Sequence, residues 1–165
     1  MAWDNIIYRT DPELDFVLNQ KIDSLCSINL KNNLGKQVKE NFMMSRAFAL
    51  NNIGARFNEQ GDYGKAIEYH TQSLKIEEEI GNKQGIALSL NNIGVIYKEQ
   101  GDYARAIESY TQSLKIKEEI GDKQGIATSL NNIGVIYQEQ GESAKAIEYF
   151  TQSLKIEEEV GNKKG

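Results

Sequence analysis

The side chains best suited to chemistry in this sequence are one histidine and one cysteine. His70 and Cys26 are single residues of their types, whereas a zinc site needs several such ligands together. A serine or cysteine nucleophile also needs a partner base. His70 falls in a slot that Tyr110 and Phe150 fill at steps of 40 residues. We therefore interpret His70 as a side chain packed between helices, and we predict no metal site.

Glutamates form three runs that resemble paired catalytic carboxylates: Glu77–Glu79, Glu118–Glu119 and Glu157–Glu159. Each run lies close to a lysine near the end of an expected helix, and we interpret all three as solvated helical faces. The segments GDYGKA and NLGKQ lack the first glycine and the Ser or Thr of a phosphate-binding loop. The sequence thus predicts no enzymatic activity and no cofactor.

Composition and charge narrow the possible partners and the compartment. The 165 residues carry a formal net charge of −5 and no basic block, which argues against nucleic acid and anionic membrane as partners. The N-terminal residues include several charges and form no apolar signal-peptide core. No run approaches the roughly 20 apolar residues of a membrane-spanning helix. A single cysteine is typical of a reducing compartment, and we expect a cytoplasmic protein.

The elements that must position these side chains come from an internal repeat, which the glycines mark. Twelve of the 14 glycines fall into four series that step by 40: Gly54, Gly94, Gly134; Gly61, Gly101, Gly141; Gly81, Gly121, Gly161; and Gly85, Gly125, Gly165. The units run 47–86, 87–126 and 127–165; the first two agree at 28 of 40 positions, and the last two at 28 of 39. Such periods indicate a stacked-repeat architecture.

Each unit predicts two helices, A and B. Leu90, Ile93, Gly94 and Tyr97 form one helical stripe, the EQGDY segment interrupts it, and Ala106 begins a second stripe. Gly121 suits a left-handed position after a helix, and Asp122 suits an N-cap, as do Asn82 and Asn162. The A helices are expected near 45–60, 83–100 and 123–140, and the B helices near 63–80, 103–120 and 143–160.

One glycine in every A helix must serve close packing, because glycine within a helix costs about 1 kcal/mol relative to alanine. Gly54, Gly94 and Gly134 occupy this place. We expect a large B-helix neighbour such as Tyr110 to fill the space that the missing Cβ leaves.

These residues resemble the tetratricopeptide repeat, in which W-x2-L-G-x2-Y on helix A precedes A-x3-F on helix B. The matching residues are Leu50, Ile53, Gly54, Phe57, Ala66 and His70; Leu90, Ile93, Gly94, Tyr97, Ala106 and Tyr110; and Leu130, Ile133, Gly134, Tyr137, Ala146 and Phe150. Leucine replaces tryptophan, and the closing proline is missing, which lets helix B lengthen the unit to 40 residues. In this longer form the chain is similar to the repeats of kinesin light chain, Pins-type adaptors and bacterial arrays that precede histidine kinases.

The resemblance implies an all-α fold, a right-handed α-solenoid of antiparallel helix pairs that binds a protein or peptide partner. In this family the A helices line a concave groove. Its positions carry over to Phe48, Asn51, Ala55 and Asn58; to Leu88, Asn91, Val95 and Lys98; and to Thr128, Asn131, Val135 and Gln138. Lys98 is the one basic residue of the set, so a clamp for a partner's terminal carboxylate is not expected.

Asn51, Asn91 and Asn131 recur at one A-helix position. An amide offers donors and an acceptor, so the three could read the backbone of an extended peptide, with Ala55, Val95 and Val135 giving apolar contact. The alternative is that these amides bond only between repeats. For the adjacent Asn52, Asn92 and Asn132, the structural role is the favoured interpretation.

Two further alternatives concern the whole chain. The function we predict is a scaffold or adaptor; a regulatory or sensory segment of a multidomain signalling protein is the second hypothesis, and a self-associating spacer the third. Residues 1–46 are expected to form a helical N-terminal cap or a degenerate repeat, with a helix start at Asp11-Pro12. We also expect the chain to be part of a longer array and to self-associate weakly through its last unit.

Overall fold

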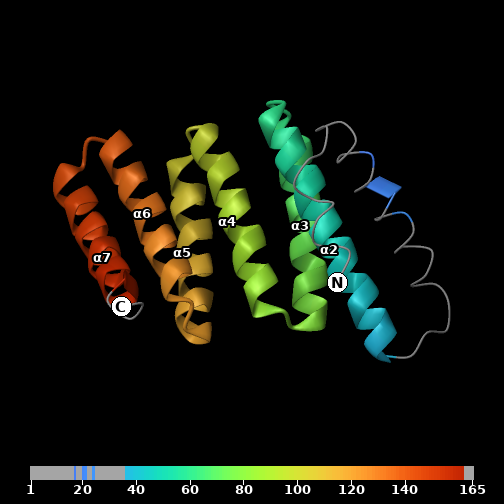
Figure 1. Ribbon diagram of the computed structural model, residues 1–165. Helices are drawn as coiled ribbons and strands as arrows, with labels where there is room; N and C mark the ends of the chain where they lie inside the picture. Colours follow the sequence, from blue (N-terminus) through green and yellow to red (C-terminus); the bar gives the residue numbers. More distant parts are fainter. Residues whose placement is uncertain (1–16, 18–19, 22–23, 25–35, 162–165) are drawn as a thin grey trace. The chain divides into compact units, whose positions relative to one another are not determined.

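The computed structural model describes residues 36–161 and, before them, positions 17, 20, 21 and 24. The described helices are α2 (Lys36–Glu59), α3 (Tyr63–Ile80), α4 (Lys83–Glu99), α5 (Tyr103–Ile120), α6 (Lys123–Glu139) and α7 (Ser143–Gly161) (Figure 1). The chain divides into two compact units, Met1–Ile76 and Glu77–Gly165, and each is described by itself. The expectations for Pro12, Cys26 and Asn162 lie outside the described residues. None of the described helices is long and apolar enough to cross a membrane.

The predicted helix boundaries follow from local capping. The side chains of Asn82 and Asp122 accept hydrogen bonds from the backbone N–H groups of Gly85 and Gly125, and so cap α4 and α6. Gly121 ends α5 with a φ of 71°, in the left-handed region that glycine tolerates best. The B helices and the A helices of the second and third units begin and end within one residue of their predicted positions, and these predictions are confirmed.

The first A helix differs from its prediction. α2 begins at Lys36, not near residue 45, and it runs unbroken through the expected boundary at residue 46. No glycine or proline lies between Lys36 and Ile53 to stop it. Met43 is buried along this added length, so tertiary packing also supports the longer helix.

A ring packed against a glycine closes each helix pair. A Cβ built on Gly94 would lie 2.7 Å from Tyr110 Cε1, and one built on Gly134 would lie 2.7 Å from Phe150 Cε1. In the compact unit Met1–Ile76, a Cβ built on Gly54 would lie 2.9 Å from His70 Nε2. These separations are too short for any residue with a Cβ, which confirms that the repeated glycine serves close packing between helices A and B.

A serine on each B helix joins the same pair by a hydrogen bond. Ser73 Oγ donates to the carbonyl of Ala47 at 2.8 Å. The equivalent bonds run from Ser113 to Ala87 at 2.7 Å and from Ser153 to Ala127 at 2.9 Å. All three serines are buried, so each bond satisfies a hydroxyl that would otherwise cost free energy to desolvate. The repeated serine was present in the sequence and was not interpreted there.

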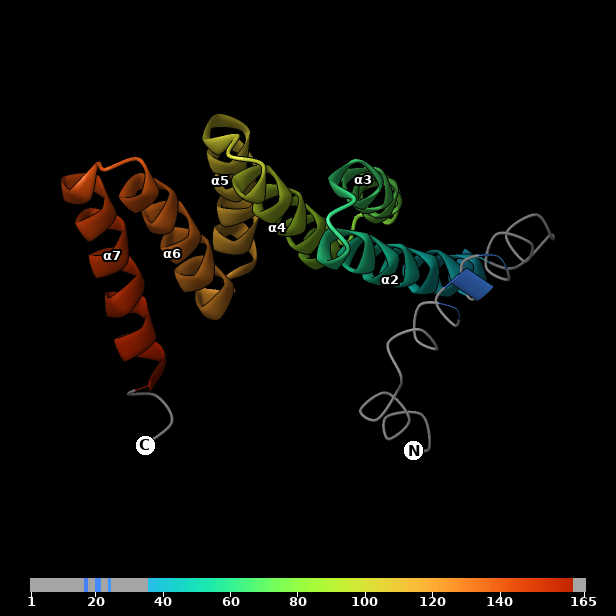
Figure 2. The same cartoon turned by 90° about the horizontal axis from the view of Figure 1, so that it is seen from above.

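Successive helix pairs share one core in the unit that holds α4 to α7. Tyr110 and Ala106 of α5 pack against Ile133 and Ile136 of α6. Lys117 Nζ of α5 also donates to Ser129 Oγ of α6 at 2.9 Å, and both residues are buried. Figures 1 and 2 show α6 and α7 side by side as the next antiparallel pair.

We predict that Gly94→Val lowers the free energy of unfolding by roughly 2–4 kcal/mol, because the added side chain must displace Tyr110 from a filled core. Urea denaturation measures the loss. Gly64→Val is the matched control: Gly64 lies on α3, where a Cβ meets only Asp62 Oδ1 at 3.8 Å. The control should change stability by less than about 0.5 kcal/mol, and equal losses in both variants would contradict the packing role of Gly94.

Candidate functional site

The A-helix positions carried over from the family differ in exposure. We call the positions on α4 and α6 the A-helix surface: Leu88, Asn91, Val95 and Lys98, and Thr128, Asn131, Val135 and Gln138. Leu88 is 49% exposed, and Thr128, Asn131 and Gln138 are also exposed. The remaining four are half-buried. This surface therefore combines accessible amides with accessible apolar side chains.

One hydrogen bond brings α4 and α6 together at this surface. Asn132 Nδ2 donates to Asn91 Oδ1 at 3.2 Å. The bond gives Asn132 the structural role that the sequence favoured for it, and it ties Asn91 to the following repeat. It uses only the acceptor of the Asn91 amide, and no bond from its Nδ2 hydrogens occurs within the described chain.

The equivalent positions on α2 belong to the other compact unit, and they differ. Ala55 is exposed and Asn58 is half-buried, whereas Asn51 is buried. Asn51 Nδ2 donates to Ser73 Oγ at 2.8 Å, and Asn51 Oδ1 lies 2.7 Å from His70 Nδ1. Because a carbonyl oxygen can only accept, the proton of neutral His70 lies on Nδ1. Asn51 is thus engaged inside its own helix pair.

His70 is a partner that only Asn51 has among the three repeated asparagines. Its side chain is 1% exposed, which confirms its interpretation as a packed residue. Burial lowers the pKa of His70 from 6.5 to about 4, because desolvation disfavours the charged imidazolium. Tyr110 and Phe150 occupy the slot in the other units and offer no ring nitrogen to an asparagine, so Asn91 and Asn131 are not held in this way.

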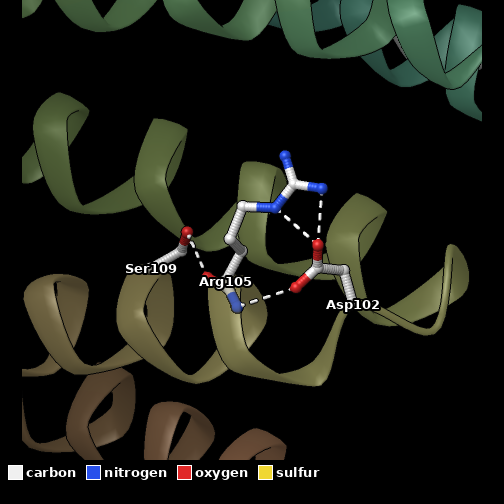
Figure 3. Close-up of polar contacts among 3 residues, drawn as sticks. All are labelled: Asp102, Arg105 and Ser109. Atoms are coloured by element: carbon white, nitrogen blue, oxygen red, sulfur yellow. Dashed lines mark hydrogen bonds and ion pairs between the residues drawn. The ribbon is translucent and has the colours of Figure 1, made fainter.

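The turn between helices A and B carries a cluster of charged and aromatic side chains with a structural role. Asp102 caps α5 by accepting from the backbone N–H of Arg105 at 3.1 Å, and the Arg105 guanidinium binds the same carboxylate (Figure 3). This contact lowers the pKa of Asp102. Arg105 also lies 4.4 Å from the ring centroid of Tyr97. Within α5, Ser109 Oγ donates to the Arg105 carbonyl at 2.9 Å.

The glutamate runs require one correction. Glu78 and Glu79 are exposed, as are Glu118 and Glu119, but Glu77 is only 5% exposed. Its carboxyl group fills the space above Gly85, and burial raises its pKa, partly opposed by a hydrogen bond with Asn82.

Glu77 is buried because its position on the helix faces the next helix, where its carboxyl group meets Gly85. Lys117 occupies the same position one repeat later, where burial lowers the pKa of its amine. Charge alone does not show which glutamate of a run faces inward. Among the described residues, no group of three His, Cys, Asp or Glu side chains could hold a metal ion.

Paired antiparallel helices repeating at 40 residues define an all-α helical repeat protein of the solenoid type. A family model described as tetratricopeptide repeat matches residues 45–119 and 86–159. The chain belongs to this tetratricopeptide repeat family, whose members are protein-interaction repeats.

Solved structures agree with the fold. BtubC (BKLC) from P. vanneervenii is 19% identical with a TM-score of 0.68, over 94% of this chain and 68% of that chain. The N-terminal domain of stress-induced protein-1 from C. elegans is 22% identical with a TM-score of 0.60, over 69% and 86%. Aspartyl phosphate phosphatase F from Bacillus subtilis is 16% identical with a TM-score of 0.71, over 94% and 43%. No curated protein matches the chain.

The depressed pKa of His70 predicts a pH-dependent stability. Protonation favours the unfolded chain, so the contribution is fully present above pH 6.5 and is lost as the pH falls toward 4. Between pH 7.5 and 5 the parent should lose about 2 kcal/mol more unfolding free energy than His70→Phe, which carries the side chain of the third unit. Urea denaturation at both pH values measures the difference. Parallel losses in parent and variant would contradict a buried, neutral His70.

Proposed function

We propose that the chain is a protein–protein interaction module, without catalysis of its own, that binds an extended peptide along the A-helix surface of α4 and α6. The observation that carries the proposal is the pairing of accessible amides with accessible apolar side chains at repeated positions on adjacent A helices. Asn131 is exposed, and Leu88 is 49% exposed. A scaffold or adaptor role follows from such binding.

The chemistry of these side chains suits a peptide backbone. The Asn131 amide can donate to a peptide carbonyl and accept from a peptide N–H. Asn91 keeps its donors for a ligand, since Asn132 occupies its acceptor. Val95 and Val135, each four residues further along the helix, can contact small apolar side chains of the same peptide. Each repeat would thereby read one short stretch of backbone and one side chain.

The charges of the A-helix surface favour an uncharged stretch of peptide over nucleic acid. Lys98 is its one cationic side chain, and phosphate backbones are bound by many. The net charge of −5 also works against anionic membranes. The same lack of cations argues against recognition of a terminal carboxylate. The ligand class is therefore the internal, extended segment of a protein.

A peptide-binding experiment with paired asparagine variants tests this proposal. A peptide selected from a library of extended sequences should bind at least tenfold more weakly to Asn91→Ala/Asn131→Ala, because each unpaired buried group costs about 1–3 kcal/mol. Calorimetry measures the affinity, and circular dichroism should show helicity close to the parent, with stability lower by about 1 kcal/mol because Asn132 loses its acceptor.

Asn51→Ala is the matched control, because it changes the same residue at the equivalent position. It should lower stability by about 1–3 kcal/mol, since His70 and Ser73 lose a buried partner. Its folded fraction should bind the peptide as tightly as the parent. The proposal is wrong if the double variant binds normally while folded, or if its affinity falls only in step with its stability.

A further inference from the structure

Glu77 carries a buried carboxyl group that has no part in the A-helix surface. Its side chain is 5% exposed, and its Oε2 atom is buried without a hydrogen-bond partner among the described residues. A Cβ built on Gly85 would lie 2.2 Å from Glu77 Cδ, so the carboxyl group packs directly on the first turn of α4. Glu77 and α4 belong to the same compact unit. Buried polar atoms without a partner are rare in folded proteins, and each one calls for an explanation.

The surroundings of this carboxyl group compensate a negative charge poorly. Burial raises the pKa of Glu77, and a hydrogen bond with Asn82 opposes the shift in part. Among the described residues, no charged side chain on α3, α4 or α5 contributes to this shift. Lys83, the first residue of α4, pairs with Glu119 at 3.0 Å, and the Gly85 N–H donates to Asn82 Oδ1. The carboxylate therefore costs more free energy to bury here than the neutral acid does.

The repeat changes this residue together with the helix cap five residues later. The pairs are Glu77 with Asn82, Lys117 with Asp122, and Glu157 with Asn162. Lysine thus accompanies a charged cap, and glutamate accompanies a neutral one. Burial lowers the pKa of Lys117, and the attraction of Asp122 opposes this shift. The α5–α6 junction therefore holds a compensated charge, whereas the carboxyl group at the α3–α4 junction becomes neutral only by binding a proton.

We propose that Glu77 makes the α3–α4 junction pH-dependent: its protonated side chain holds the first turn of α4 in place, and its ionisation loosens that turn. The neutral acid stays buried against Gly85, whereas the carboxylate gains free energy by reaching water. The junction should be tight below pH 4.5 and should loosen as the pH rises through the folded-state pKa of Glu77. This device goes beyond the proposed peptide function and does not depend on it.

A carbon-13 NMR titration of the full chain tests whether Glu77 retains its proton. The carboxyl signal of Glu77 is the one that Glu77→Gln removes. We expect its midpoint to lie above 4.5, the ordinary value for a glutamate, and above the midpoints of the exposed Glu78 and Glu79. A midpoint at or below those of its two neighbours would overturn the proposal.

Hydrogen exchange tests whether ionisation loosens the turn. The Ile86 N–H donates to the Asn82 carbonyl at 3.0 Å. Its protection, relative to the intrinsic exchange rate at each pH, should fall at least about threefold between pH 4.5 and 7.5. The Ile126 N–H donates to the Asp122 carbonyl at 2.8 Å and is the internal control. It should keep its protection, because no carboxyl group of α5 fills the equivalent slot.

Three variants separate the charge of Glu77 from its size. Glu77→Gln keeps the size of the side chain but cannot ionise, so Ile86 should show no pH-dependent loss of protection. Glu78→Gln is the matched control on an exposed neighbour, and it should behave as the parent does. The double variant Glu77→Lys/Asn82→Asp installs the pair of the second unit and should also abolish the pH dependence.

Circular dichroism checks that each variant is folded. His70 is present in all of these chains, so its own titration does not affect the comparison among them. Equal pH responses of Ile86 in the parent and in Glu77→Gln would overturn the proposal. Equal responses of Ile86 and Ile126 within the parent, or a response that persists in the double variant, would overturn it as well.

Discussion

The packing of a B-helix ring onto an A-helix glycine is the constraint on which the rest of this structure depends. Tyr110 on Gly94 and Phe150 on Gly134 let the backbones of each pair approach closely. That approach brings Ser113 and Ser153 within hydrogen-bonding distance of A-helix carbonyls. The buried side of each A helix is thereby fixed, and its other side is left to present Asn131, Leu88 and their neighbours.

Small changes in the ring slot alter what identical residues can do. In the first repeat the imidazole of His70 occupies the ring slot. It forms a hydrogen bond with Asn51, whose side chain is buried. In the second unit Tyr110 leaves Asn91 to bond with Asn132 of the next repeat. In the third unit Phe150 accompanies an exposed Asn131. One asparagine position thus serves a helix pair, a repeat junction and an open surface. A residue that recurs in each repeat does not have the same role in each, because its hydrogen-bond partners depend on the residues that surround it.

Local signals made most of the fold predictable. Gly121 marks a helix end because glycine tolerates the left-handed backbone, and Asp122 marks a helix start because its side chain caps the first turn. Neither signal needs a tertiary contact. The start of α2 at Lys36 was missed although Gly35 precedes it in the sequence. The prediction followed the 40-residue repeat, which does not include residues 36–44, and burial of Met43 supports these added turns. The predicted solvent exposure of Glu77 was wrong because its burial depends on the space above Gly85 in another helix. The positions of the A-helix surface followed from the resemblance to the tetratricopeptide repeat, but the exposure of each side chain depends on its partners on other helices.

A double-mutant cycle between Gly94 and Tyr110 tests the central contact most directly. Gly94→Ala, Tyr110→Ala and the double variant would be unfolded in urea at one pH. If the ring occupies the space of the missing Cβ, Gly94→Ala is costly beside tyrosine and harmless beside alanine. The account predicts a coupling free energy of about 1–3 kcal/mol, with the double variant more stable than additivity allows. Additive losses, within about 0.5 kcal/mol, would show that the two residues act independently and would contradict it.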